Sequence, residues 1–104
     1  MIKQEISTEE SIARILSTPL GSRVMNPEYG SRLFELIDKT ADDEWVLLAS
    51  DFTYEAIEKN EPRVAIQRVK ISTGANASID IVYLENDLQK SVSVALSEVS
   101  NATA

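Results

Sequence analysis

The chain has 104 residues, contains neither cysteine nor histidine, and carries a formal net charge of −7 at pH 7. This length is typical of one domain, which we expect to span residues 1–104. Without cysteine and histidine the chain cannot form a disulfide, a Ser-His-Asp triad or a zinc site built from imidazole and thiolate. The negative charge argues against a nucleic-acid partner, because binding to a phosphate backbone needs clustered lysine and arginine.

No segment of the sequence predicts a membrane span or a signal peptide. Uninterrupted apolar runs such as Val46–Ala49 are far shorter than the roughly 20 residues that cross a bilayer. The stretch Met1–Glu10 is acidic and lacks the apolar region of a signal peptide. We therefore expect a protein that is made and assembled in a cytoplasm and that has no membrane partner.

The first predicted element is a helix over about Thr8–Ser17. The stretch from Ser7 to Glu10 fits a capping box, with Ser7 as the N-cap and the Glu10 side chain reaching back to it. Apolar residues follow at helical spacing, and Pro19 marks the end of the helix. The residues of this apolar face are Ile12, Ile15 and Leu16.

A loop is predicted over residues 18–30, which contain two prolines and two glycines. This loop also carries three larger apolar or aromatic side chains, those of Val24, Met25 and Tyr29. We expect these three side chains to anchor the loop against the rest of the domain.

Two further helices are predicted after the loop. Ser31 is a candidate N-cap for a short helix over about Arg32–Asp38. Asp42 or Asp43 then caps the longest helix, over about Glu44–Lys59. Apolar side chains recur along this helix at intervals of three and four residues, which predicts one buried stripe. The stripe consists of Trp45, Leu48, Ala49, Phe52 and Ala56.

Beyond residue 62 the apolar spacing changes from helical to alternating, which predicts three strands. The first covers Arg63–Ile71, where a slip in the alternation indicates a bulge near Gln67–Arg68 or burial of both faces. The second covers Ala77–Leu84 and the third Lys90–Leu96. Their short connections predict an antiparallel meander. Helices followed by strands indicate an α+β fold with the N-terminal helices packed on one face of the three-stranded sheet.

The acidic residues do not form a recognisable catalytic or metal-binding pattern. Most of them, including the run Asp42–Glu44, lie where helix N-termini favour negative charge. That run lacks the spacing of an EF-hand loop, and the three glycines are isolated and form no phosphate-binding loop. We therefore predict no catalytic residues, no cofactor and no bound metal.

The tripeptide Glu61-Pro62-Arg63 lies where the long helix is followed by the first strand. Proline fixes the backbone, and the planar guanidinium group of arginine suits bidentate pairing with a carboxylate. The tripeptide is explained either by a helix stop with an internal contact between Glu61 and Arg63 or by a rigid elbow that binds a partner.

The third predicted strand is a weakly protected edge of the sheet. Its outward face contains the small polar residues Ser91 and Ser93, and its main charge is Lys90. The first strand, by contrast, has a proline and three basic residues, which commonly protect an edge. This asymmetry predicts that the third strand pairs with an extended segment of another chain or is covered by the chain's own termini.

Three motifs in this order carry a resemblance to a known family. They are Thr18-Pro-x-Gly, Asn26-Pro-x-x-Gly-Ser and Glu61-Pro62-Arg63, followed by the meander. Over about residues 5–98 the chain resembles the small baseplate wedge proteins of contractile phage tails and their type VI secretion relatives, the gpW or lysozyme-like family.

The resemblance implies a structural protein, not an enzyme, in the baseplate of a virion tail or related particle assembled in the bacterial cytoplasm. It implies that Glu61, Pro62 and Arg63 dock onto other wedge proteins. It also implies that the sheet, similar to the handshake domain of the sheath protein, initiates sheath assembly, with the tail tube as a further neighbour. The lysozyme label leaves a peptidoglycan-cleaving hydrolase as the alternative.

Overall fold

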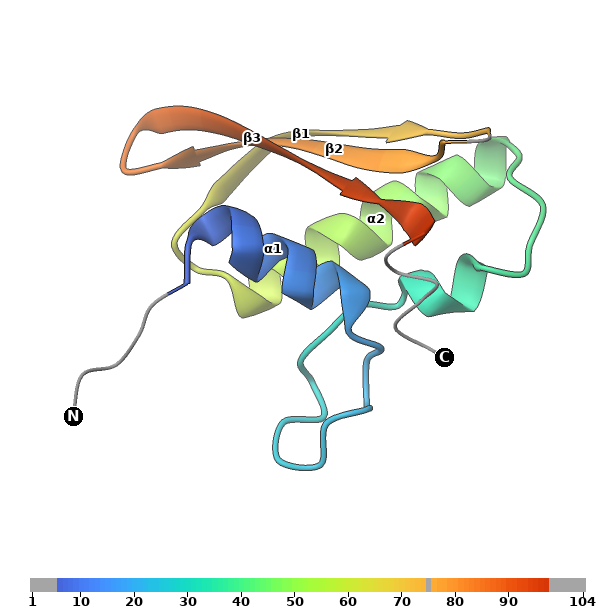
Figure 1. Ribbon diagram of the computed structural model, residues 1–104, viewed down its shortest axis with the longest axis horizontal. Coiled ribbons are helices and arrows are strands. Elements are labelled where there is room, and N and C mark those ends of the chain that lie inside the picture. Colours follow the sequence, from blue (N-terminus) through green and yellow to red (C-terminus); the bar gives the residue numbers. More distant parts are fainter. Residues whose placement is uncertain (1–5, 75, 98–104) are drawn as a thin grey trace.

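The computed structural model describes residues 6–74 and 76–97, which form two layers. The helices lie on one face of a three-stranded antiparallel sheet with strand order β1-β2-β3 (Figure 1). This arrangement confirms the predicted α+β fold and its meander. In chain order the elements are α1 (Thr8–Ser17), η1 (Leu33–Leu36, a 3₁₀ helix), α2 (Asp43–Asn60), β1 (Ala65–Ser72), β2 (Ser78–Glu85) and β3 (Leu88–Ala95).

Helix α1 has the predicted bounds and the predicted N-cap. The Ser7 hydroxyl accepts a hydrogen bond from the Glu10 backbone N–H at 3.1 Å. The Glu10 carboxylate pairs with Arg14 one turn later, at 3.4 Å, and so takes part in an exposed ion pair along the helix. The apolar face of α1 is completely buried, as its spacing predicted.

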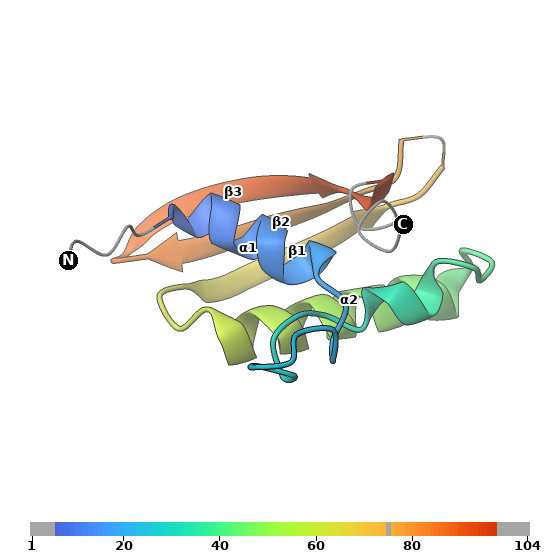
Figure 2. The ribbon, with the colours of Figure 1, turned by 60° about the horizontal axis from the view of Figure 1, so that its bottom comes forward.

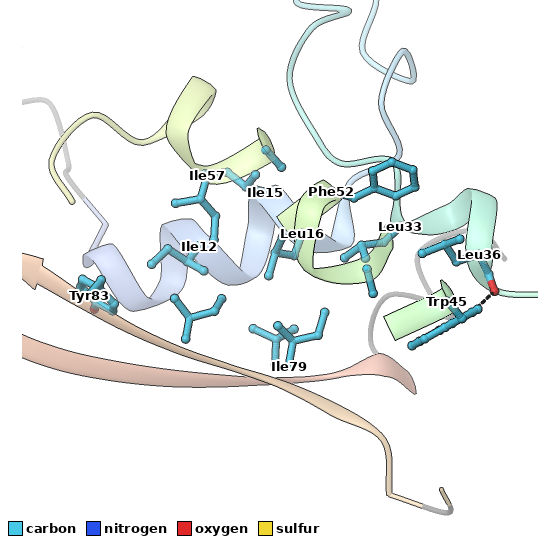
Figure 3. Packing of buried hydrophobic residues seen from close by; sticks show 14 residues of the cluster. Ile12, Ile15, Leu16, Leu33, Leu36, Trp45, Phe52, Ile57, Ile79 and Tyr83 are labelled. Atoms are coloured by element: carbon cyan, nitrogen blue, oxygen red, sulfur yellow. Dashed lines mark hydrogen bonds between the residues drawn. The ribbon is translucent and has the colours of Figure 1, made fainter. Parts of the chain in front are cut away.

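Helix α2 begins and ends one residue beyond each predicted bound. Asp42 is its N-cap, because the Asp42 carboxylate accepts the Trp45 backbone N–H at 2.9 Å. The Trp45 indole N–H donates to the Leu36 carbonyl at 2.8 Å and ties α2 to η1 (Figure 3). This hydrogen bond satisfies the polar atom of a buried aromatic side chain.

The prediction of a short helix over Arg32–Asp38 is wrong in both type and length. The structure has a single 3₁₀ turn, Leu33–Leu36. The N-cap position is Arg32, while the Ser31 hydroxyl donates to the Leu16 carbonyl at 2.9 Å and accepts a long hydrogen bond from the Leu33 N–H at 3.4 Å. The Ser31 side chain therefore joins this segment to the end of α1.

Between the two layers lies one apolar core (Figure 3). The predicted inward residues of β2 are completely buried, and α1 lies closer to β3 while α2 lies closer to β1 (Figure 2). The predicted stripe of α2 faces this core, with Leu48 at its edge and only partly buried. The core consists of Ile12, Ile15, Leu16, Leu33, Leu36, Trp45, Ala49, Phe52, Ala56, Ile57, Ile79, Ile81, Tyr83 and Val94.

The strands confirm the predicted bulge and begin at other residues than predicted. A register shift between Ile66 and Arg68 confirms the predicted bulge in β1. Strand β1 begins at Ala65, so the predicted start at Arg63 is wrong, because the elbow after α2 occupies residues 61–63. Strand β3 begins early, at Leu88, because Asn86 and Asp87 both have positive φ and make a two-residue turn.

The loop between α1 and η1 projects away from the sheet (Figure 1). The expectation that Val24 and Met25 anchor this loop is wrong, since both residues are 94% exposed, whereas Tyr29 is partly buried and packs against the core as expected. The loop is instead fastened at its base by backbone hydrogen bonds. The Leu20 N–H donates to the Ser31 carbonyl at 3.0 Å, and the Ser31 N–H donates to the Thr18 carbonyl at 2.9 Å.

Gly30 lies at the base of the loop, where the two backbone segments approach each other most closely. Its φ is +117°, and a Cβ at this position would lie 2.5 Å from the Thr18 carbonyl oxygen. Gly21 in the same loop also has a positive φ, +87°, but a Cβ there would meet no atom within 4 Å. Alanine at position 21 therefore introduces backbone strain alone, whereas alanine at position 30 introduces backbone strain and a steric clash.

We predict that Gly30→Ala destabilises the protein more than Gly21→Ala does. Both variants place a side chain in a left-handed conformation, which costs about 1–2 kcal/mol. Gly30→Ala also pushes two backbone segments apart, and such overpacking costs a further ~1–3 kcal/mol. Urea unfolding of both variants measures the difference, and equal losses in the free energy of unfolding would contradict this account of the loop base.

Candidate functional site

The first candidate surface is the elbow, which we define as residues Glu61–Arg63. Helix α2 stops here because Pro62 lacks the N–H that a further helical turn would need. The Glu61 N–H donates to the Ile57 carbonyl at 2.8 Å, and the Asn60 side chain donates to the Ala56 carbonyl at 2.9 Å. These two bonds hold the last turn of α2, and the chain then turns directly into β1.

Glu61 and Arg63 form a bidentate ion pair within the elbow. The Arg63 Nε and Nη2 atoms donate to the two Glu61 carboxylate oxygens, each at 2.8 Å, and the Arg63 backbone N–H adds a third bond at 3.2 Å. The Glu61 side chain is 4% exposed and that of Arg63 is 37% exposed. The internal contact that the sequence left open is therefore present.

This geometry lowers the pKa of Glu61 from 4.5 to about 2. The main cause is the hydrogen bonding from the Arg63 guanidinium, and a hydrogen bond from the Ser11 hydroxyl acts in the same direction against the effect of burial. A carboxyl group that acts as the acid in glycoside hydrolysis needs the opposite shift, to a raised pKa. Glu61 is therefore suited to holding structure and not to donating a proton.

The elbow also fixes the start of α1. The Arg63 Nη1 donates to the Ile6 carbonyl at 3.2 Å, one residue before the N-cap. Ser11, in the second turn of α1, is buried and hydrogen-bonds to Glu61. The elbow thus joins the end of α2, the start of β1 and the start of α1.

A second polar cluster holds the same end of α1 to the β2–β3 hairpin. The Thr8 hydroxyl donates to Glu85 Oε1 at 2.9 Å, and the hydroxyls of Thr8 and Tyr83 lie 3.0 Å apart. Lys90 Nζ donates to Glu85 Oε1 at 2.8 Å. The pKa of Glu85 is lowered by Lys90 first and then by Thr8. No local pattern marks this cluster, because Thr8 is more than seventy residues from Tyr83 and Glu85.

The second candidate surface is the edge formed by β3. Ser91 and Ser93 pair with Val82 and Asp80 of β2, and both serines are exposed. Because Val94 is buried among the core residues, the alternating serines face away from the helices. In the described residues β3 pairs with β2 alone. The sequence prediction therefore placed the side chains of this edge on the correct face.

The two edges of the sheet differ as predicted, although less than the sequence suggested. Pro62 and Arg63 lie before β1 and do not protect that strand. Arg68 and Lys70 do lie on β1, and both are exposed on the outer face of the sheet. The elbow and the β2–β3 turn lie at the same end of the molecule (Figures 1 and 2).

The described residues contain no group of three acidic side chains that could hold a metal ion. Across residues 6–74 and 76–97, the helices are too short or too polar to cross a bilayer.

We predict that Glu61→Gln lowers the free energy of unfolding by up to about 3 kcal/mol at pH 7. The difference between 4.5 and about 2 corresponds to this energy at ~1.4 kcal/mol per pH unit. Because the folded-state pKa is lowered, the stabilisation is present above pH 4.5 and is lost as the pH falls toward 2. The difference in the free energy of unfolding between wild type and variant should therefore become smaller as the pH falls through this interval. Urea unfolding at several pH values measures it.

Glu28→Gln is the matched control for this measurement. Glu28 pairs with Lys59 at 2.9 Å, but this ion pair is exposed, and solvent screens it. We expect the difference in the free energy of unfolding between wild type and Glu28→Gln to change less with pH. A gap for Glu61→Gln that stays constant from neutral pH to pH 2.5 would show that the Glu61 carboxylate does not stabilise the fold.

Comparison with known proteins now identifies the family. Residues 3–98 match the family described as "Baseplate wedge protein gp25". Baseplate protein W of Escherichia phage P2 is 43% identical over 60 residues, which are 58% of this chain and 52% of the phage protein. The chain thus spans about half the length of that relative.

Two solved structures have the same fold. A protein from Geobacter sulfurreducens described as a tail lysozyme superimposes with a TM-score of 0.75 and 25% identity, covering 90% of this chain and 94% of that one. A chain of the postcontracted pyocin R2 baseplate superimposes with a TM-score of 0.65 and 28% identity, covering 74% and 80%. With the family match extending over nearly all of its length, the chain belongs to the family of baseplate wedge proteins.

Proposed function

We propose that this protein docks onto its wedge partners through the elbow and starts sheath assembly from the β3 edge. As a member of the wedge family it is a structural component of the baseplate of a contractile tail. Its proposed partners are other wedge proteins, the sheath protein and, as a further neighbour, the tail tube. The observation that carries the proposal is the exposed edge of β3, which pairs with β2 alone in the described chain.

The edge of β3 is suited to adding a strand from another protein. An incoming extended segment would form main-chain hydrogen bonds with β3 and would place alternate side chains over the outer face of the sheet. Ser91 and Ser93 present only small side chains there. On the opposite edge, Arg68 and Lys70 oppose such pairing. The asymmetry favours β3 as the strand that receives the sheath protein.

The elbow is suited to docking because it is rigid before any partner arrives. Pro62 is exposed, and the partly exposed Arg63 side chain is held in one conformation by Glu61 and by the Ile6 carbonyl. A side chain that is already ordered loses little conformational entropy when it binds. The internal contact and the docking role therefore support one another, because the first prepares the surface that the second uses.

We propose that the protein performs this role without catalysis. The carboxylate that is most deeply buried at the candidate site, that of Glu61, has a lowered pKa and is paired with a cation. The similarity to the Geobacter protein described as a tail lysozyme is a similarity of fold. A shared fold does not imply a shared reaction, and the arrangement around Glu61 supports a structural role.

We predict that Ser93→Lys leaves baseplates intact but reduces the number of sheathed particles at least about tenfold. The lysine adds a charge to the outer face of β3, in the way that natural edge strands prevent pairing. Electron microscopy of particles from cells that carry the variant counts both species. Ala65→Lys is the matched control, because it adds the same charge to the exposed end of β1. Sheathed particles at wild-type numbers in Ser93→Lys would contradict the assignment of β3.

We predict that removing Arg63 in a Glu61→Gln background prevents incorporation into the wedge. A single Arg63→Ala variant would leave the Glu61 carboxylate buried without its partner, and the loss of stability would obscure any effect on docking. In the double variant the residue at position 61 is neutral, so no buried charge is left unpaired. Because the double variant also loses the bond from Arg63 to the Ile6 carbonyl, the thermal midpoints of both variants are measured alongside incorporation, and only a loss of incorporation at equal midpoints is assigned to docking. We expect at least a tenfold loss of incorporation, measured as copies per purified baseplate. Equal incorporation of the two variants would contradict docking through Arg63.

A further inference from the structure

The loop between α1 and η1 presents an apolar surface that neither the elbow nor the β3 edge uses. We define its tip as residues Ser22–Asn26. Val24 and Met25 are 94% exposed, and the next most exposed large apolar side chain of the described residues, Leu47, is 66% exposed. Single exposed apolar residues are ordinary on a protein surface. Two adjacent ones at the end of a projecting loop are unusual, and they indicate a contact with another molecule.

The tip is held by its own hydrogen bonds. The Gly21 N–H donates to the Pro27 carbonyl at 2.9 Å, the Ser22 N–H to the Pro19 carbonyl at 3.1 Å, and the Tyr29 N–H to the Asn26 carbonyl at 3.1 Å. Each arm of the loop is therefore bonded either to the other arm or to itself. A loop that is ordered in this way loses little conformational entropy on binding. The free energy gained by burying its apolar side chains therefore contributes more fully to affinity.

Charged side chains also hold the loop in position. The Arg23 guanidinium lies over the Tyr29 ring, 4.1 Å from its centroid. Farther toward the base, Glu28 forms an ion pair with Lys59 of α2 at 2.9 Å. Because Lys59 neutralises Glu28, the charge that remains at the end of the loop is that of Arg23.

The chemistry of the tip defines the surface that it fits. Arg23 is the one charged residue between positions 19 and 27 of the sequence. Among the described residues no carboxylate lies within ion-pair distance of Arg23. The tip therefore combines two apolar side chains with one cation on a protein whose net charge is −7. Its complement is an apolar pocket with a carboxylate at the rim, and the flexible Met25 side chain adapts well to such a pocket.

Two observations favour a protein over a lipid surface as the partner. The net charge of −7 repels anionic headgroups, and the tip carries no tryptophan or phenylalanine that would insert at a membrane interface. The family, in addition, acts within a multiprotein baseplate. We propose that the tip of this loop inserts Val24 and Met25 into an apolar, carboxylate-rimmed pocket of a different protein of the same baseplate. The proposal rests on the family and not on docking through the elbow or β3.

Site-specific cross-linking tests the proposal in assembled particles. We would replace Met25 by the photoreactive residue p-benzoylphenylalanine, irradiate purified baseplates that lack the sheath, and identify the joined peptides by mass spectrometry. The expected result is one cross-linked site in a single other baseplate protein, among apolar residues with an aspartate or glutamate nearby. The same photoreactive residue at Leu47, which is exposed on α2, is the matched control and should not reach that site. Cross-links to a second copy of this chain, to lipid or to no single site would overturn the proposal.

A double substitution supplies a second, independent measurement. We expect Val24→Ser/Met25→Ser to reduce incorporation into sheath-free baseplates at least tenfold, with Leu47→Ser as the control at wild-type level. The thermal midpoint of the free double variant should remain that of wild type, because both side chains are almost fully exposed. Wild-type incorporation of the double variant would overturn the proposal. Since the sheath is absent from this experiment, a failure of the β3 assignment would not affect its outcome.

Discussion

The ion pair between the buried Glu61 carboxylate and the partly exposed Arg63 is the interaction on which the arrangement of both layers depends. It lies where α2 is followed by β1, and through the Ile6 carbonyl and the Ser11 hydroxyl it also holds the start of α1. A carboxylate that is 4% exposed is tolerable only because the guanidinium satisfies it from two directions. The three elements that meet at the elbow therefore keep a fixed relation to one another, and the helices remain correctly placed over the sheet.

Within the described residues this construction leaves the opposite face of the sheet uncovered and both outer strands paired on one side only. All the helices of the described chain lie on the inner face, while Ser91 and Ser93 of β3 face outward. A sheet covered on one side has enough core to fold and still has main-chain groups available at its edge. On the proposed function, one face of the three strands serves folding and an edge of the same strands serves assembly.

Much of the fold could be predicted because it follows local periodic patterns. The apolar spacing in α1 and α2, the alternation in β2 and the slip in the alternation of β1 each report burial directly, and the register shift between Ile66 and Arg68 confirmed the last of these. The N-caps Ser7 and Asp42 could be predicted for the same reason, since capping acts over three residues.

The loop could not be predicted in this way, because backbone hydrogen bonds at its base hold it in place. Val24 and Met25 are apolar, but polar main-chain contacts between Thr18, Leu20 and Ser31 make their burial unnecessary. The polar cluster around Thr8 is equally invisible to local patterns, since its members meet only after the chain has folded. The sequence did place Glu61 and Arg63 side by side, but it did not reveal that the carboxylate is buried and that the pair also binds the start of α1.

The bond between Thr8 and Tyr83 has a consequence for synthesis of the protein on the ribosome. These residues are separated by 75 positions, so at about 5–20 residues per second the partner of Thr8 is made roughly 4–15 seconds later. During this interval α1 has been synthesised, but the strands that cover its apolar face have not. Helix α1 also packs against α2 and can make that contact first, whereas the part of α1 that meets the sheet must wait for the last hairpin. The apolar face of α1, formed by Ile12, Ile15 and Leu16, is therefore fully covered only after the last hairpin has been made, and until then it is exposed to non-native contacts.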